Sequence, residues 1–313
     1  MIDYIYKVGN FNLGAQTSAF NLEGYYDVFN MSAEDLTTST VYLERRKTKG
    51  CKDNDYREFE FIICPNIGFL GNNLPLPTDC ELKLSFDRAS PYTSVLRIDG
   101  GTDLDEPFSL TDIVAITEYV SSPHLRDIMS SIDYMPLIHT FDECDVMIKN
   151  IPLSETEIRF ENIRGGNTPI YMFFGIIPQS CLTGDPAYSS TYFQRHNVKE
   201  MNITLNGNSV NGYPMSVKRN NPTNPLQKFL DVTNRYYNVS SGETLDLDNF
   251  KYNWLWSHAF ESESTSQGWI GVSFKLTTPY TKNMALVCWT VSRTGLTIDK
   301  FGSVEKISLS DIQ

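Results

Sequence analysis

Apolar and polar side chains alternate with a period of two in short segments along most of this chain. In the clearest segment, residues 80–88, Leu82, Leu84 and Phe86 face one side and charged or hydroxyl side chains face the other. Successive residues of a strand point to opposite faces of a sheet, so this pattern is typical of a strand with one buried face. Further strands are predicted at residues 57–63, 146–151, 157–162, 170–177, 199–205, 210–217, 254–260, 269–276, 284–291 and 296–301.

A predicted hairpin and a predicted central strand indicate the kind of sheet that these segments form. Residues 199–205 and 210–217 flank the Asn206-Gly207 pair, and Asn-Gly is the strongest short hairpin signal because both residues tolerate positive φ. Residues 171–177 are apolar on both faces, which predicts a strand in the middle of a sheet. Strands that follow one another with turn residues between them are typical of an antiparallel sandwich. We therefore expect an all-β fold of the jelly-roll β-sandwich type.

Few helices are predicted. One runs over residues 223–237, where Pro225 lies in the first turn and Leu226 and Phe229 begin an apolar stripe. We expect this helix to lie over a loop end of the sandwich. Residues 109–131 repeat apolar side chains at roughly helical spacing and predict a short helix or an irregular excursion. One or two short helices are thus expected beside the strands.

The composition restricts the partners and the compartment. Acidic residues (38) outnumber basic ones (26), and a net charge of -12 repels phosphate backbones, so direct contact with nucleic acid is not expected. No secretion signal is found, and no stretch has the ~18 apolar residues of a membrane-spanning helix. We expect a soluble chain, made in the cytosol, whose isolated cysteines are reduced core residues. These cysteines are Cys51, Cys64, Cys80, Cys144, Cys181 and Cys288.

No motif of catalysis or metal binding is found. The four histidines lie in separate segments, and the glycine pairs at 100–101 and 165–166 fit turns but no nucleotide-binding fingerprint. Residues 139–145 hold a histidine, three carboxylates and the Cys144 thiol, but the groups of a metal or nucleophile site converge from separate elements. We interpret this segment as a polar loop between domains, and the acidic segment 99–106 as a solvated turn. The sequence predicts no catalytic residue, no cofactor-binding residue, no metal ligand and hence no enzyme.

Two alternatives to a purely structural role stay open on the residues alone. Trp254 and Trp256 share one face of a predicted strand, with Trp269 and Trp289 on neighbouring strands. In a sandwich such a row more often fills the space between the sheets, and it also suits stacking against sugar rings. A glycan-binding jelly-roll module is therefore the alternative function. A hydrolase that uses carboxylates near Asp142 ranks behind it.

Three parts of the chain carry patterns that occur together in one family of viral proteins. Residues 74–88 (LPLPTDCELKLSFDR) have a turn followed by a strand with a K-L-x-F pattern. Residues 176–214 combine a strand, a loop of small and aromatic residues, an x-N-G hairpin and a proline-containing exit. Residues 284–291 and 296–300 (LTIDK) are similar to a closing apolar strand and an I-x-I-D-[KR] pattern. Together they resemble the double jelly-roll major capsid proteins of Polinton (Maverick) elements and adintovirus-like viruses.

The resemblance implies an architecture and a role. Family members have two jelly rolls that stand upright on a capsid surface, so we expect a first jelly roll over residues 1–145 and a second over residues 146–313. The family usually carries further strands ahead of the point where this chain begins, so the first jelly roll is expected to be truncated, reduced or completed by another segment. The resemblance also implies a structural protein of the virion, synthesised in the host cytoplasm. Such a protein forms homotrimers and builds an icosahedral shell with other capsid proteins, such as a penton.

Overall fold

The structure is a computed structural model that describes mainly the second half of the chain. The predicted first jelly roll, with its strands at 57–63 and 80–88, the turn at 99–106 and nearly all of the segment at 109–131, lies outside the described residues. The described residues are 136–183, 195–217, 222–237, 254–260, 267–299 and 303–308, with the single positions Lys83, Ser85, Ile113, Val114, Pro123, His124, Asp127, Phe193 and Phe250.

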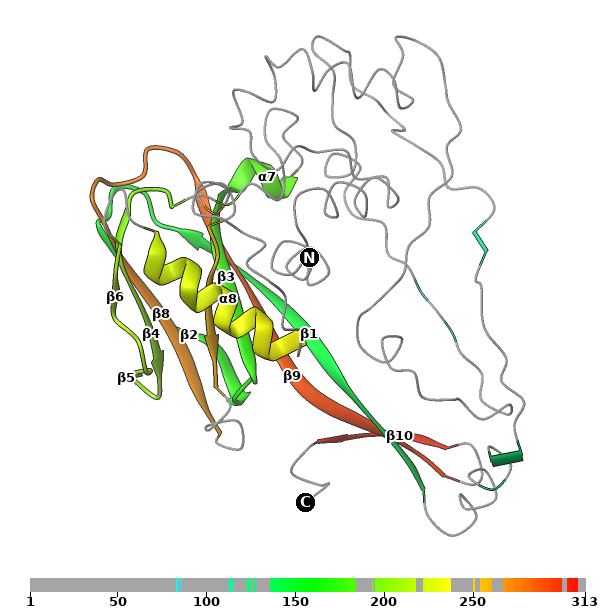
Figure 1. The fold of residues 1–313 in the computed structure, drawn as a ribbon. Helices are drawn as coiled ribbons and strands as arrows, with labels where there is room; N and C mark the ends of the chain where they lie inside the picture. Colours follow the sequence, from blue (N-terminus) through cyan, green and yellow to red (C-terminus); the bar gives the residue numbers. More distant parts are fainter. Residues whose placement is uncertain are drawn as a thin grey trace, which may run out of the picture.

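The described strands form two antiparallel sheets (Figure 1). Sheet A has the order β1-β9-β3-β7, with β10 also paired to β9, and sheet B has the order β2-β8-β4-β5, with β6 also paired to β4. The strands are β1 Leu137–Ile151, β2 Glu157–Asn167, β3 Tyr171–Pro178, β4 Val198–Leu205, β5 Asn208–Ser209, β6 Met215–Ser216, β7 Trp256–Ala259, β8 Gln267–Leu276, β9 Met284–Ile298 and β10 Val304–Ser308. The helices are α7 Gln179–Thr183 and α8 Thr223–Tyr237.

The strand order is that of a jelly roll. The strands pair as nested couples: β1 with β9, β2 with β8, β3 with β7, and β4 with the two short strands β5 and β6. Successive couples alternate between sheet A and sheet B, as they do when one long antiparallel ribbon rolls up into two layers. Two more pairings, β9 with β3 and β8 with β4, join the couples within each sheet. The prediction of an all-β jelly-roll sandwich is confirmed for this part of the chain.

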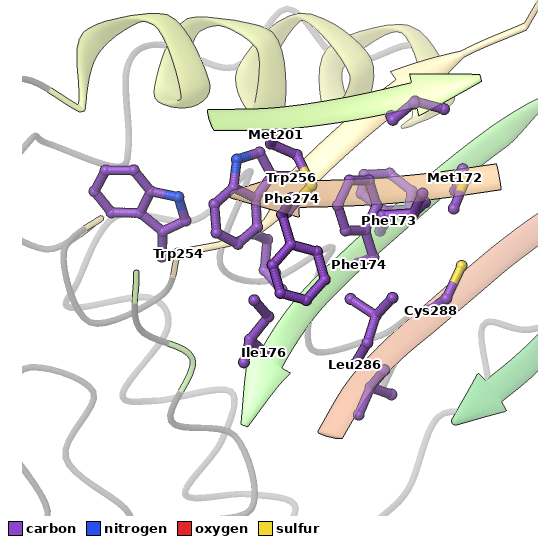
Figure 2. Close-up of a cluster of buried hydrophobic side chains, with 14 of the residues drawn as sticks. Met172, Phe173, Phe174, Ile176, Met201, Trp254, Trp256, Phe274, Leu286 and Cys288 are labelled. Atoms are coloured by element: carbon purple, nitrogen blue, oxygen red, sulfur yellow. The ribbon is translucent and has the colours of Figure 1, made fainter. Parts of the chain in front are cut away.

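The core lies between the two sheets and is strongly aromatic (Figure 2). Phe174 on β3 stacks on Trp256 on β7 at a ring distance of 5.9 Å, and both side chains are at most 1% exposed. Sheet B contributes Met201 and Phe274, which are directly opposite each other in the register of β4 and β8. β3 is buried at every position from Tyr171 to Ile177, so the prediction of a central strand there is confirmed.

The predicted hairpin forms at the expected position. Asn206 and Gly207 have φ values of 52° and 83°, so both adopt the left-handed conformation that this two-residue turn requires. The strand that returns from the turn is shorter than predicted. Only Asn208–Ser209 and Met215–Ser216 pair with β4, since the residues between them leave the ladder.

Helix α8 has the predicted bounds but not the predicted location. Its side chain Phe229 meets the ring of Phe173 on β3 edge to face at 6.2 Å, and Ser257 Oγ on β7 donates a hydrogen bond to the Lys228 carbonyl oxygen at 3.2 Å. The helix therefore packs against sheet A and does not lie over a loop end, because its apolar stripe covers aromatic side chains of β3. Neither α7 nor α8 is long and apolar enough to cross a membrane.

Three local predictions are wrong for the same physical reason. Residues 139–145, predicted as an interdomain loop, belong to β1. The glycines at 165–166, predicted as a turn, belong to β2. The segments 284–291 and 296–301, predicted as two strands, are joined in one strand, β9, which ends at Ile298. In each case, hydrogen bonding to a distant strand fixes an extended backbone that the local residue types do not favour. β1, for example, is paired with β9 along its whole length. β10 was not predicted.

Candidate functional site

The carboxylates that the sequence groups together are separated by the fold. In an extended strand, neighbouring side chains point to opposite faces, so the acidic residues of β1 reach different partners. No group of three or more His, Cys, Asp or Glu side chains that could hold a metal ion is found in the described ranges. A hydrolase site near Asp142 therefore has no geometric support. The ion pairs are Asp142 with Arg293 at 3.2 Å, Glu143 with Lys306 at 2.7 Å and Asp145 with Arg164 at 3.0 Å.

The thiols of the sandwich are in their unreactive form. Burial raises the pKa of the Cys144 thiol to about 11, and burial also raises the pKa of Cys288. Only a thiolate is a good nucleophile or metal ligand, so both groups are inert at neutral pH. Of the three free cysteines in the described part of the chain, Cys181 and Cys288 are buried and Cys144 is half-buried. Cys51, Cys64 and Cys80 lie outside the described residues.

Among the histidines of the sandwich, His139 and His258 are buried and His196 is half-buried. Burial lowers the pKa of His196 to about 4 and that of His258 to about 3, and it also lowers the pKa of His139. The ring of His258 packs edge to face against Phe260 at 4.5 Å and Tyr213 at 5.8 Å. These side chains therefore serve as packing groups, and they come from separate elements.

One cation connects the two sheets. The side chain of Arg164 on β2 is 18% exposed and reaches across to sheet A, where Nη1 lies 3.0 Å from the Asp145 carboxylate on β1. Nη1 also donates to Thr290 Oγ1, and Nη2 donates to Ser292 Oγ at 3.0 Å, both on β9. A bulge between Phe160 and Arg164 shifts the register of β2 just before this residue. The contact is structural, because every group in it is held by another group of the protein.

An apolar row is exposed on β1, at the edge of sheet A. Ile138, Val146 and Ile148 are 44%, 54% and 50% exposed, and their even spacing places them on one face of the strand. β1 pairs only with β9 among the described strands, so within this part of the chain its other side is a sheet edge. Large apolar side chains beside an edge are typical of a protein interaction surface. The row was not predicted, since residues 146–151 carry apolar side chains at both odd and even positions.

The edge continues into an arm that extends beyond the sandwich (Figure 1). β3 pairs with β9 only as far as Val291, whereas β1 and β10 pair with β9 up to Ile298. The arm thus consists of residues 137–143, 292–298 and 304–308. It adds Val304, which is 52% exposed, to the apolar surface of this region.

The four tryptophans separate into three core residues and one surface residue. Trp254, Trp256 and Trp289 are 3%, 1% and 1% exposed, so none can stack on a sugar. Trp256 lies opposite Phe174, whereas Trp289 lies opposite Phe173 on the other face of sheet A, where α8 packs, so the prediction that the row fills the space between the sheets is wrong for Trp289. Trp269 on β8 differs, because it is 46% exposed. Strand alternation could have identified it: Trp269 shares its face of β8 with Ser273 and not with the buried Val272.

Comparisons with known proteins give structural neighbours only. No protein-family model and no curated protein sequence matches this chain. A Sputnik virophage structure from cryo-EM matches with 9% identity and a TM-score of 0.37, covering 56% of this chain and 39% of that one. PBCV-1 Vp54, fitted into a reconstruction of Sputnik, matches with 9% identity and a TM-score of 0.38, covering 59% and 54%. The mavirus major capsid protein matches with 8% identity and a TM-score of 0.33, covering 60% and 43%. The matched parts thus span less than two thirds of those chains, and the jelly-roll assignment rests on the strand order of this chain itself.

Proposed function

We propose that this chain is a capsid-type structural protein whose function is to associate with copies of itself. The observation that carries the proposal is the exposed apolar row of Val146 and Ile148 on the edge strand β1. A jelly roll has two sheets packed face to face and forms a rigid wall whose edges and loops are free for contacts between subunits. A second copy of the chain is the partner that we assign to this row.

The free energy gained by burial of this row is modest, which suits a contact that is repeated between many copies of the chain. Full burial of a Val or Ile side chain is worth roughly 1.5–3 kcal/mol, so half-exposed side chains gain roughly 1 kcal/mol each. Stable interfaces bury about 800 Å² on each partner. The row is thus the apolar centre of a larger contact, to which the arm (residues 137–143, 292–298 and 304–308) contributes further surface.

The finer parts of the proposal rest on the sequence resemblance. Its most specific segments, 284–291 and 296–300, fall on β9 as far as Ile298, and β9 joins β1, β3 and β10 in sheet A. On this basis we propose a homotrimer that assembles into an icosahedral shell of a virion together with other capsid proteins such as a penton. We also propose that the part of the chain ahead of β1 supplies the first jelly roll predicted for residues 1–145, and that β1 and the residues after it form the second, predicted for residues 146–313. In this role the chain has no enzymatic activity and touches no nucleic acid directly.

Light scattering of the full chain against protein concentration tests the proposal, at low and near-physiological salt. We expect the average mass to rise to three times that of one chain or higher, and to rise more readily with salt, because salt screens the repulsion between subunits of net charge -12. Electron microscopy of the largest species then shows whether shells form. A mass of one chain at every concentration and salt would contradict self-association.

A further inference from the structure

The outer face of sheet B carries a groove that self-association through β1 does not involve. Side chains of β2, β8 and β4 line it, and its volume is about 500 Å³. The register places Arg159, Ser273 and Asn202 in one row across the three strands, and Glu157, Lys275 and Glu200 in the row beside it. These positions alternate with buried ones, so the groove lies on the side of the sheet that faces away from the core. The groove is concave and polar.

One position of β8 beside the groove, Gly271, is closed off by the groups next to it. A Cβ atom at Gly271 would lie 2.6 Å from Thr204 Oγ1 and 3.1 Å from the Glu161 carbonyl oxygen, so no larger residue fits there. The hydroxyl groups of Thr204 and Ser273 and the amide of Asn202 surround this position. Asn202 Oδ1 is buried and accepts no hydrogen bond from the described residues.

Trp269 stands at one end of the groove with its indole ring 46% exposed. Its cross-strand neighbour on β2 is Gly165, which has no side chain to cover the ring. The backbone of Trp269 is held by a hydrogen bond, in which its N–H donates to Asn206 Oδ1 at 3.0 Å. The same oxygen packs closely on the preceding residue, since a Cβ atom at Gly268 would lie 2.5 Å from it. The ring is therefore an exposed aromatic surface on a rigid support.

The charges of the groove compensate one another. Lys275 Nζ lies 2.8 Å from the Glu200 carboxylate, and this hydrogen bond raises the pKa of Lys275; Arg159 lies 3.7 Å from Glu157. With Glu161 added, the lining has three acidic and two basic side chains. A groove of this kind has no strong field to attract a polyanion. It also differs from the centre of a protein–protein interface, which is depleted in Lys and Glu.

We propose that this groove binds a neutral glycan. An aromatic ring beside hydroxyl and amide groups matches a sugar, whose ring carries C–H groups on its faces and hydroxyls at its edge. One sugar ring stacks on Trp269, and the next extends along the groove, where Thr204, Ser273 and Asn202 exchange hydrogen bonds with its hydroxyls. The site is independent of the association proposed for β1, so either can fail alone.

Tryptophan fluorescence of the full chain with a panel of neutral oligosaccharides tests the site, because Trp269 differs from the three buried core tryptophans. We expect a bound sugar to shift the emission and to protect Trp269 from quenching by acrylamide. Calorimetry should show that Trp269→Ala weakens binding about tenfold or more and that Thr204→Val weakens it several-fold. Val304→Ala, on the exposed face of the arm, is the matched control and should bind as wild type does.

Three results would overturn the proposal. The first is that no neutral oligosaccharide binds at millimolar concentration. The second is that binding survives in both Trp269→Ala and Thr204→Val while far-UV circular dichroism shows that they are folded. The third is that the protection of Trp269 from acrylamide depends on the concentration of the protein and not on that of the sugar. In that case a second copy of the chain would cover the groove.

Discussion

The guanidinium group of Arg164 and the carboxylate of Asp145 form an ion pair at 3.0 Å that joins the two sheets of the jelly roll. The two residues come from β2 and β1, which are consecutive in the chain but belong to different sheets. Because Arg164 also donates to Thr290 and Ser292 on β9, a single side chain connects three strands. Hydrogen bonds to a charged group are stronger than neutral ones, so this contact should matter to stability.

Replacement of Arg164 should destabilise the sandwich. Arg164→Met keeps most of the side-chain volume but leaves the fully buried Thr290 hydroxyl without the guanidinium, and we expect a loss of about 2 kcal/mol. Urea unfolding followed by circular dichroism measures the change. Arg159→Met is the control, since that side chain is 69% exposed and its ion pair with Glu157 is long at 3.7 Å. Equal effects of the two substitutions would show that Arg164 does not stabilise the contact between sheets.

Gly175 on β3 should tolerate no side chain. A Cβ atom there would lie 2.6 Å from the Phe193 ring and 2.9 Å from Leu255, so Gly175→Ala should cost about 1–3 kcal/mol through overpacking. Gly165→Ala is a matched control on a neighbouring sheet, because its nearest atom would be 3.6 Å away, and we expect it to stay within about 0.5 kcal/mol of wild type. Thermal unfolding of both variants compares them directly. If Gly175→Ala unfolds at the same temperature as wild type, the packing around Phe193 is looser than described.

The free energy of unfolding should fall as the pH drops below the pKa of a free histidine side chain, about 6.5. The pKa values of His196 and His258 fall to about 4 and about 3 in the folded chain, whereas an unfolded histidine has a pKa near 6.5. Below pH 6.5 the unfolded chain binds protons that the folded chain does not, so the free energy of unfolding decreases from pH 6.5 down to about pH 4 for His196 and about pH 3 for His258. Urea midpoints at intervals between pH 7 and pH 4.5 measure this slope.

The variant His258→Gln separates the contribution of one histidine. Its overall stability will differ from that of wild type, because the ring contacts with Phe260 and Tyr213 are lost. The comparison therefore uses only the slope of the free energy of unfolding against pH. We expect a shallower slope than that of wild type in the same pH range. An unchanged slope would mean that His258 is already protonated in the folded chain at these pH values.

Charges placed on the apolar row of β1 should prevent self-association. In the variant that combines Val146→Lys with Ile148→Lys, burial of the row against a second copy would require desolvation of two ammonium groups. Light scattering should then show single chains at concentrations where wild type forms larger species. Leu153→Lys, at a position 46% exposed just beyond β1, is the control and should associate as wild type does. If the double variant assembles normally, the contact between copies lies elsewhere.

Local signals predicted the parts of the fold that local physics determines. Asn and Gly tolerate positive φ better than other residues, which predicts the turn at Asn206 and Gly207. The helix at 223–237 is predicted by a proline in its first turn and by its apolar stripe. Alternation located most of the strands, because burial of one face leaves a direct trace in the sequence. Trp269 follows the same rule, although sequence alone could not show that its neighbour across the sheet is a glycine.

The errors occur where a distant strand determines the conformation. Thr294 and Gly295 look like a break in β9, yet they are paired with Phe141 and Thr140 on one side and with Ser308 and Ile307 on the other. Arg164 is unremarkable in sequence, and its role depends on Asp145, Thr290 and Ser292, which become neighbours only when the two sheets meet. Propensity carries no information about such pairings, since they depend on the topology of the whole domain.

The nesting of the strand couples has a consequence for the synthesis of the chain. The outermost couple joins Leu137 to Ile298, the two ends of the sandwich, so β1 leaves the ribosome long before its only described neighbour exists. Until β9 is made, no other described strand can pair with β1 or cover its apolar row, and contacts of such long sequence separation form slowly. Folding of this jelly roll should therefore be completed only once β9 has been synthesised, and chains produced close together on one messenger would meet while this strand is still open.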